Sequence, residues 1–147
     1  MNAEDVVAAL GLEPLPVEGG HFAQGHRSGE LSTIYYLLRG GEFSALHRLR
    51  HVEVYAYHLG APLRMLLLHP DGSVSEPVLG GSLGEGQRPQ VVVPAGVWQA
   101  SRSDDWTLVT TVVVPPYADD VVEFGDAEEL AVEFPSHALE IRGFGVA

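Results

Sequence analysis

His47 and Glu53 are the residues whose types and spacing best suit them to chemistry in this sequence. They lie on two consecutive segments in which polar and apolar residues alternate as on β-strands. If the faces that carry them point inward, the histidine and the carboxylate meet inside the protein, with Tyr55 and Tyr57 on the same face as Glu53. A buried pair of this kind costs free energy unless it is hydrogen-bonded, which favours a site for acid–base chemistry. The alternative is a core histidine whose hydrogen bonding is satisfied by Glu53 alone.

The composition removes several other kinds of chemistry. The chain of 147 residues contains no cysteine, and all eight of its basic residues are arginine, so lysine is absent as well. These two absences exclude thiol nucleophiles, disulfides, Schiff-base lysines and the lysine of a phosphate-binding P-loop. A hydrophobic content of 46% indicates a globular protein with a normal core.

Charge and hydropathy limit the partners. The formal net charge is −12, which argues against nucleic acids and anionic membrane surfaces as partners. No apolar run approaches the ~18 residues that a membrane-spanning helix needs. Glu4 and Asp5 stand where a signal peptide carries positive charge, so we expect a cytoplasmic protein.

The elements that must position the pair are mostly strands. Asn2 is a candidate N-cap and Gly11 a stop signal for one short helix at the start of the chain. Glycine and proline turns then separate runs rich in valine, leucine, tyrosine and threonine, and a short helical turn is expected after Asp126. The predicted strands are 33–38, 43–50, 53–59, 63–69, 91–93, 98–102 and 106–114. This pattern predicts one all-β domain over residues 1–147, built as a β-sandwich or small barrel.

The spacing of Gly41, His47, Glu53 and Gly60 resembles the first motif of the cupin superfamily, G-x5-H-x-H-x3-E-x6-G, with Leu49 at its second histidine position. The resemblance to this superfamily implies that the chain folds as a jelly-roll β-sandwich of the RmlC-like type. The superfamily's second motif, G-x5-P-x-G-x2-H-x3-N, is matched in part. Pro94 and Gly96 are present, while Gln99 stands at the histidine position.

The resemblance bears on cofactors. A metal-binding cupin uses both histidines and the glutamate of the first motif and the histidine of the second. Here His47 and Glu53 remain, with Gln99 as a weak neutral oxygen donor. Stable sites for transition metals need three or four well-placed ligands. We therefore expect no tightly bound metal and predict no cofactor. If a metal binds, its ligands are expected to be His47, Glu53 and Gln99.

Further matches make the resemblance narrower. The block V-P-A-G-x-W-Q at residues 93–99 is the most specific of them. Other matching segments follow in order at 12–14, 18–22, 32–38, 43–49, 79–80, 91–100 and 115–117. Together they resemble the uncharacterised cupin-5 family of bacteria and fungi, whose residue pattern departs from this chain at Pro16-Val17 and His51-Val52. The resemblance spans about residues 10–135, which it implies as the core of the domain. The resemblance implies a homodimer and a pocket inside the barrel whose ligand the family does not identify.

Three hypotheses follow for the function of this pocket, and the sequence does not decide whether the protein is an enzyme. In some sugar-acting cupins a histidine–carboxylate pair abstracts a proton beside a carbonyl group and a tyrosine returns it, which makes His47, Glu53, Tyr55 and Tyr57 candidate catalytic residues of a metal-independent isomerase or epimerase. The alternative is a non-catalytic protein in which His47, Glu53, Gln99 and Glu18 bind a small polar, sugar-like molecule. A metal-dependent cupin with a reduced ligand set is the third hypothesis.

Overall fold

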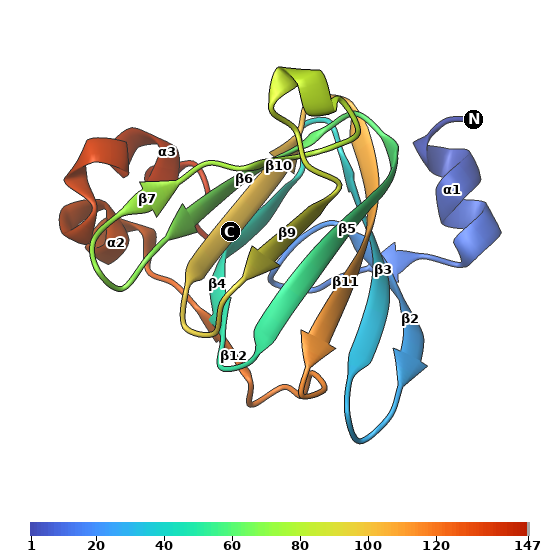
Figure 1. The fold of residues 1–147 in the computed structure, drawn as a ribbon, viewed down its shortest axis with the longest axis horizontal. Coiled ribbons are helices and arrows are strands. Elements are labelled where there is room, and N and C mark those ends of the chain that lie inside the picture. The colour runs from blue at the N-terminus through green and yellow to red at the C-terminus, as the bar shows by residue number, and fades with distance from the viewer. Residues whose placement is uncertain (147) are drawn as a thin grey trace.

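Two antiparallel sheets face each other in the computed structural model, which describes residues 1–146 (Figure 1). The first sheet has the strand order β1 (Glu13–Pro14), β2 (His21–Arg27), β3 (Ser32–Arg39), β11 (Trp106–Val114), β5 (Val52–Gly60) and β9 (Gln90–Val93). The second has the order β12 (Val122–Phe124), β4 (Phe43–Leu49), β10 (Trp98–Ser103), β6 (Leu63–Leu68) and β7 (Val74–Ser75), with β8 (Val78–Leu79) also paired to β6. The predicted all-β jelly-roll sandwich with a short N-terminal helix is confirmed.

Helices cover the outer faces of both sheets. Helix α1 (Ala3–Leu10) packs on the first sheet, where Val6 and Leu12 contact Leu37 and Leu108. Helices α2 (Ala127–Glu133) and α3 (Ala138–Arg142), joined by a short 3-10 helix at Pro135–His137, pack on the second sheet (Figure 1). Strand β6 is therefore buried on both faces, which explains its nearly continuous run of apolar residues.

The N-terminal helix has the boundaries that the sequence predicts. The Asn2 side chain accepts a hydrogen bond from the Asp5 backbone N–H at 3.0 Å, and the Asp5 side chain accepts one from the Asn2 backbone N–H at 2.8 Å. Gly11 ends the helix in the left-handed conformation, with a φ of 65°. No helix of residues 1–146 is long and apolar enough to cross a membrane.

The seven predicted strands are present, and none of their predicted ends differs from the observed end by more than one residue. Strand β2 was not predicted, because its sequence H-F-A-Q-G-H-R lacks clear alternation and its backbone is held by pairing with β3. The C-terminal helices are longer than the single turn that was expected after Asp126, and a 3-10 helix forms at Leu83–Glu85. The C-terminal helices depend on packing partners that are distant in the sequence, such as Leu46 and Leu68.

Candidate active site

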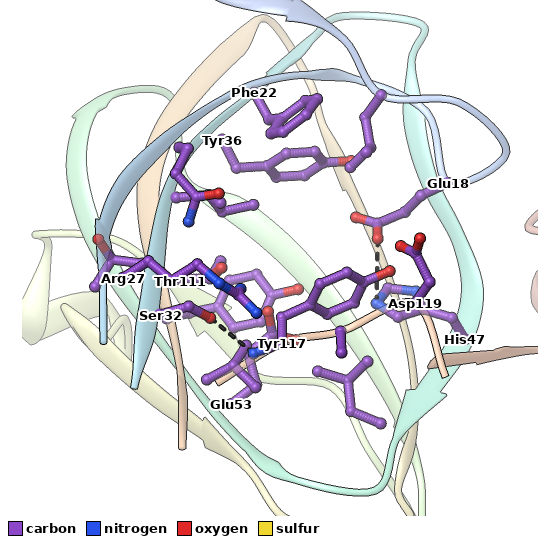
Figure 2. A pocket seen from close by; sticks show the side chains of 18 of the residues that line it. Glu18, Phe22, Arg27, Ser32, Tyr36, His47, Glu53, Thr111, Tyr117 and Asp119 are labelled. Carbon is purple, nitrogen blue, oxygen red and sulfur yellow. Dashed lines mark hydrogen bonds and ion pairs between the residues drawn. The ribbon is translucent and has the colours of Figure 1, made fainter. Parts of the chain in front are cut away.

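A cavity of about 620 Å³ opens between the two sheets. Its size falls in the range of small-molecule sites. Aromatic and aliphatic side chains form much of its wall, among them Phe22, Ile34, Tyr55 and Val113, and polar side chains converge on it from several elements (Figure 2). Such a cavity can hold a molecule of metabolite size and fix it by a few polar contacts.

His47 lies in the wall of this cavity on strand β4 and is 2% exposed. Its Nδ1 lies 2.7 Å from the backbone oxygen of Ala45, so Nδ1 carries the proton and donates this hydrogen bond. The other ring nitrogen, Nε2, lies 3.6 Å from Oε1 of Glu18. In the neutral ring Nε2 therefore has a free lone pair, and it can accept a proton beside a carboxylate.

Glu18 reaches His47 from the loop that follows strand β1. Its Oε2 accepts a hydrogen bond from the Ser44 hydroxyl at 3.1 Å, and its backbone oxygen accepts one from the Ala45 N–H at 2.8 Å. The sequence predicts Glu18 only as a ligand-binding residue. The structure places it in the cavity wall as the carboxylate nearest to the ring of His47.

Glu53 lies across the cavity from His47, because β5 belongs to the first sheet and β4 to the second. This corrects the expectation that His47 and Glu53 form a hydrogen-bonded histidine–carboxylate pair. The Ala45 carbonyl sets the orientation of the ring instead. Glu53 is 7% exposed, and its Oε1 accepts a hydrogen bond from Nε2 of Gln99 at 2.8 Å.

Gln99 lies behind the cavity wall and does not line the cavity. Its Nε2 donates to Glu53, and its Oε1 accepts a hydrogen bond from the Tyr55 hydroxyl at 2.6 Å. Both ends of the amide are thus engaged within the protein, which corrects the expectation that Gln99 binds the ligand. Gln99 lies directly opposite His47 in the pairing of β10 with β4, and it holds Glu53 and Tyr55 in place from there.

The two tyrosines of strand β5 differ in position. Tyr55 lines the cavity, but its hydroxyl points to Gln99. Tyr57 lies four residues beyond Glu53, roughly 13 Å further along the strand, and its hydroxyl donates to the Gly60 carbonyl. Tyr57 is absent from the cavity lining, which corrects the expectation that it forms part of this wall.

Tyr117 is a cavity residue that sequence reasoning missed. Its backbone N–H donates to the Ser32 hydroxyl at 2.8 Å, and its phenol extends into the cavity on the side of Glu18, His47 and Asp119 (Figure 2). Burial raises the pKa of Tyr117, and the carboxylates of Asp119, Glu18 and Glu53 raise it further, so the phenol stays protonated at neutral pH. The only sequence signal was its match to the family pattern at 115–117, which carries no spatial information.

The environment of Glu53 favours its protonated form. Burial raises the pKa of this carboxyl above its ordinary value, although the nearby His47 and the hydrogen bond from Gln99 act in the opposite direction. Glu18 adds to the increase by charge repulsion. The protein therefore holds a carboxyl group in the cavity wall that is more readily protonated than an exposed glutamate.

Replacing Glu53 with glutamine is expected to change how stability depends on pH. Because the folded state raises the pKa of Glu53, the wild type loses stability as the pH rises from the unfolded pKa through the folded pKa. Glutamine cannot lose a proton, so the stability of Glu53→Gln relative to the wild type should increase over this interval. Urea unfolding at pH 4, 6 and 8 measures the difference, with the exposed Glu30→Gln as control. A relative stability that falls with pH contradicts the expectation.

Two facing antiparallel sheets around a cavity with converging polar side chains define a jelly-roll protein of the cupin type. The chain belongs to the family described as Cupin superfamily (DUF985), whose sequence pattern matches residues 4–125. A Shewanella oneidensis protein of known X-ray structure is 34% identical, with a TM-score of 0.92 over 99% of this chain and 98% of that one. A hypothetical protein from Leishmania major is 24% identical, with a TM-score of 0.91 over the full length of both chains.

More distant structures share the fold alone. Oxalate decarboxylase from Bacillus subtilis is 14% identical, with a TM-score of 0.63 over 90% of this chain and 37% of that chain. An RmlC-like cupin from Shewanella frigidimarina is also 14% identical, with a TM-score of 0.58 over 75% of this chain and 87% of that one. A comparison with proteins of curated function finds no match. The homodimer expected from the resemblance stays a prediction.

The cavity residues do not fit the metal centre that some cupins carry. Leu49 lines the cavity at the second histidine position, and both ends of the Gln99 amide are used by Glu53 and Tyr55. His47 and Glu53 face each other from opposite sheets and do not gather with a third ligand into a compact group. Within residues 1–146, three such ligand atoms come within 4.8 Å of one another at Glu76, His137 and Glu140, outside the cavity.

Proposed function

We propose that the cavity binds a small polar molecule and that His47 exchanges a proton with it, as in a metal-independent isomerase or epimerase. The observation that carries this proposal is the state of His47. Its Nδ1 is fixed by the Ala45 carbonyl, and its Nε2 lies 3.6 Å from the Glu18 carboxylate in the cavity wall. This is the arrangement of a general base whose cationic form is stabilised by a neighbouring carboxylate.

The neighbouring groups support such a proton transfer. Nε2 of His47 takes a proton from a carbon atom beside a carbonyl group, and the negative charge moves onto the carbonyl oxygen. The protonated phenol of Tyr117 can donate a hydrogen bond to that oxygen. If the first carbon carries a hydroxyl group whose proton passes to the former carbonyl oxygen, return of the carbon-bound proton to the former carbonyl carbon gives an isomer with the carbonyl group moved by one position. Return of the proton to the other face of the original carbon gives an epimer. The role that the sequence predicts for Tyr55 or Tyr57 passes to Tyr117 in this proposal.

A non-catalytic binding protein is the second candidate. The carboxylates of Glu18, Glu53 and Asp119 all line the cavity and can accept hydrogen bonds from ligand hydroxyl groups without any proton transfer. The two candidates share the cavity and differ in whether the bound molecule exchanges a carbon-bound hydrogen.

The binding step can be tested by thermal shift with sugars, sugar acids, sugar phosphates and sugar nucleotides. Molecules that bind the folded protein raise its melting temperature by mass action. We expect the shift to be reduced in His47→Ala and Glu53→Gln and retained in His58→Ala, whose side chain is exposed on strand β5. Equal shifts in the wild type and in both cavity variants would place the binding site elsewhere.

The proton-transfer step can be tested with the same molecules in deuterium oxide. Mass spectrometry should detect deuterium at one carbon of a bound molecule in the presence of the wild type. In His47→Gln the incorporation should slow by about 100-fold or more, because general bases contribute about 10²–10⁴-fold to rates. Binding that depends on His47 without any incorporation would establish the non-catalytic candidate instead.

A further inference from the structure

We infer that the ligand of this cavity carries an anionic group, a carboxylate or a phosphate, which Arg27 binds at the rim. This inference rests on the proposed function and adds the chemical class of the ligand and its orientation. Arg27 ends strand β2, is exposed, and lines the same cavity as His47 and Glu53. Its guanidinium extends from the rim across the opening (Figure 2).

Arg27 differs from most arginines of this protein in its contacts. Five others form ion pairs with carboxylates: Arg39 with Glu4, Arg48 with Glu123, Arg50 with Asp120, Arg64 with Asp104 and Arg142 with Glu128. Arg27 forms no such pair with any carboxylate in the described part of the chain. In a protein with 20 acidic residues and a net charge of −12, a cation without a partner at a cavity rim indicates a partner from outside the protein.

A second hydrogen-bond donor lies on the same side of the cavity. Ser32 is 3% exposed, and its hydroxyl oxygen accepts the Tyr117 N–H. The hydroxyl hydrogen of Ser32 is therefore available for another acceptor, and Ser32 lines the cavity on the side of Arg27 (Figure 2). A guanidinium and a hydroxyl group are donors that carboxylate and phosphate oxygens can accept from.

Two of the three acidic side chains that line the cavity lie on its opposite side, whereas the third, Glu53, lies across the cavity from His47. Glu18 and Asp119 lie there with His47, away from Arg27 and Ser32 (Figure 2). An anionic group would be repelled at that side, so the ligand must enter with its charged end toward Arg27 and its neutral end toward His47. The substrate class is therefore a small hydroxy or keto acid, or a sugar phosphate, whose reacting carbon lies at the end opposite the charge.

The ligand class can be tested with four compounds that share one sugar ring: glucose, glucuronate, glucose 6-phosphate and glucosamine. Calorimetric titration of the wild type should give tighter binding for glucuronate or glucose 6-phosphate than for the neutral and cationic compounds. Arg27→Gln should weaken the anionic compounds by about 10-fold to 100-fold and leave glucose within about 3-fold. Arg64→Gln removes an exposed arginine from the opposite sheet and serves as the matched control. Preference for glucosamine, or an anion preference that survives Arg27→Gln, would overturn the inference.

A spectroscopic measurement covers the case in which the glucose skeleton does not fit the cavity. In the ¹H–¹⁵N spectrum of the arginine side chains, the signal missing from Arg27→Gln identifies Arg27. Titration with inorganic phosphate and with acetate should shift this signal at lower concentration than the signals of Arg64 and Arg102. Equal, weak shifts for all three arginines would contradict the inference.

The outcomes separate this inference from the proposed function. Loss of the anion preference in Arg27→Gln without deuterium incorporation supports the ligand class and contradicts proton transfer. Deuterium incorporation that requires His47 but is unaffected by Arg27→Gln supports proton transfer and contradicts the ligand class.

Discussion

Replacing Gln99 with leucine is expected to lower the free energy of unfolding by about 3–5 kcal/mol. The Gln99 side chain is 2% exposed, and it joins the buried Glu53 carboxyl to the buried Tyr55 hydroxyl. Its removal leaves the Glu53 carboxyl without a donor and the Tyr55 hydroxyl without an acceptor. Each orphaned group costs about 1–3 kcal/mol, and more where it is charged.

Urea unfolding measures this loss, and Gln90→Leu is the matched control. Gln90 is exposed on strand β9 of the other sheet, so its replacement should change stability by about 0.5 kcal/mol or less. Adding Tyr55→Phe to Gln99→Leu removes the unpaired hydroxyl and should restore part of the loss, which a double-mutant cycle quantifies. A loss below about 1 kcal/mol for Gln99→Leu would mean that this hydrogen-bonded bridge contributes little.

Replacing Gly19 with alanine is expected to cost about 3–5 kcal/mol and to weaken ligand binding. Gly19 has a φ of 97°, and an added Cβ would lie 2.5 Å from the backbone oxygen of Phe43. The Gly19 carbonyl also accepts a hydrogen bond from the buried Tyr36 hydroxyl at 2.6 Å. The loop cannot shift away from Phe43 without disturbing this bond and the neighbouring Glu18, which faces His47.

The variant Gly72→Ala separates the cost of the left-handed backbone conformation from the cost of the contact between the added Cβ and Phe43. Gly72 has a similar φ of 90°, but an added Cβ would meet nothing within 4 Å. Its replacement should therefore cost only the backbone penalty of about 1–2 kcal/mol and leave binding unchanged. Thermal and urea unfolding measure both variants, and ligand titration measures the effect on the cavity. Equal losses for the two variants would show that contact with Phe43 is not the cause.

The strained conformation of Val17, two residues before Gly19, supports the importance of this loop. Val17 has a φ of 68°, which is rare for a β-branched residue and costs free energy. The surrounding contacts hold the loop in this conformation, since the Leu15 carbonyl accepts the Gly19 N–H at 3.1 Å and the Glu18 carbonyl accepts the Ala45 N–H at 2.8 Å. The strain is located where the backbone turns Glu18 toward His47.

Much of the fold could be predicted from the sequence because it follows from local patterns. The capping residues Asn2 and Gly11 and the alternation along most strands depend on residues close in the chain. Strand β2 was missed because its seven residues do not alternate, and its place is determined by pairing with β3. The spacing of the motifs also indicated that His47, Glu53 and Gln99 lie near one another, and they do.

The contacts of these site residues were decided only by the tertiary structure. His47 and Glu53 are six residues apart, yet the chain crosses from one sheet to the other between them, and no local pattern encodes that crossing. Glu18 meets His47 because backbone bonds fix a strained loop over strand β4. Tyr117 and Arg27 enter the cavity from segments at opposite ends of the chain. The sequence by itself indicated seven of the strands and the polar residues His47, Glu53, Gln99 and Glu18. The packing of the sheets decided which of these side chains face the cavity and which only hold others in place, because side-chain neighbours across two sheets depend on long-range pairing.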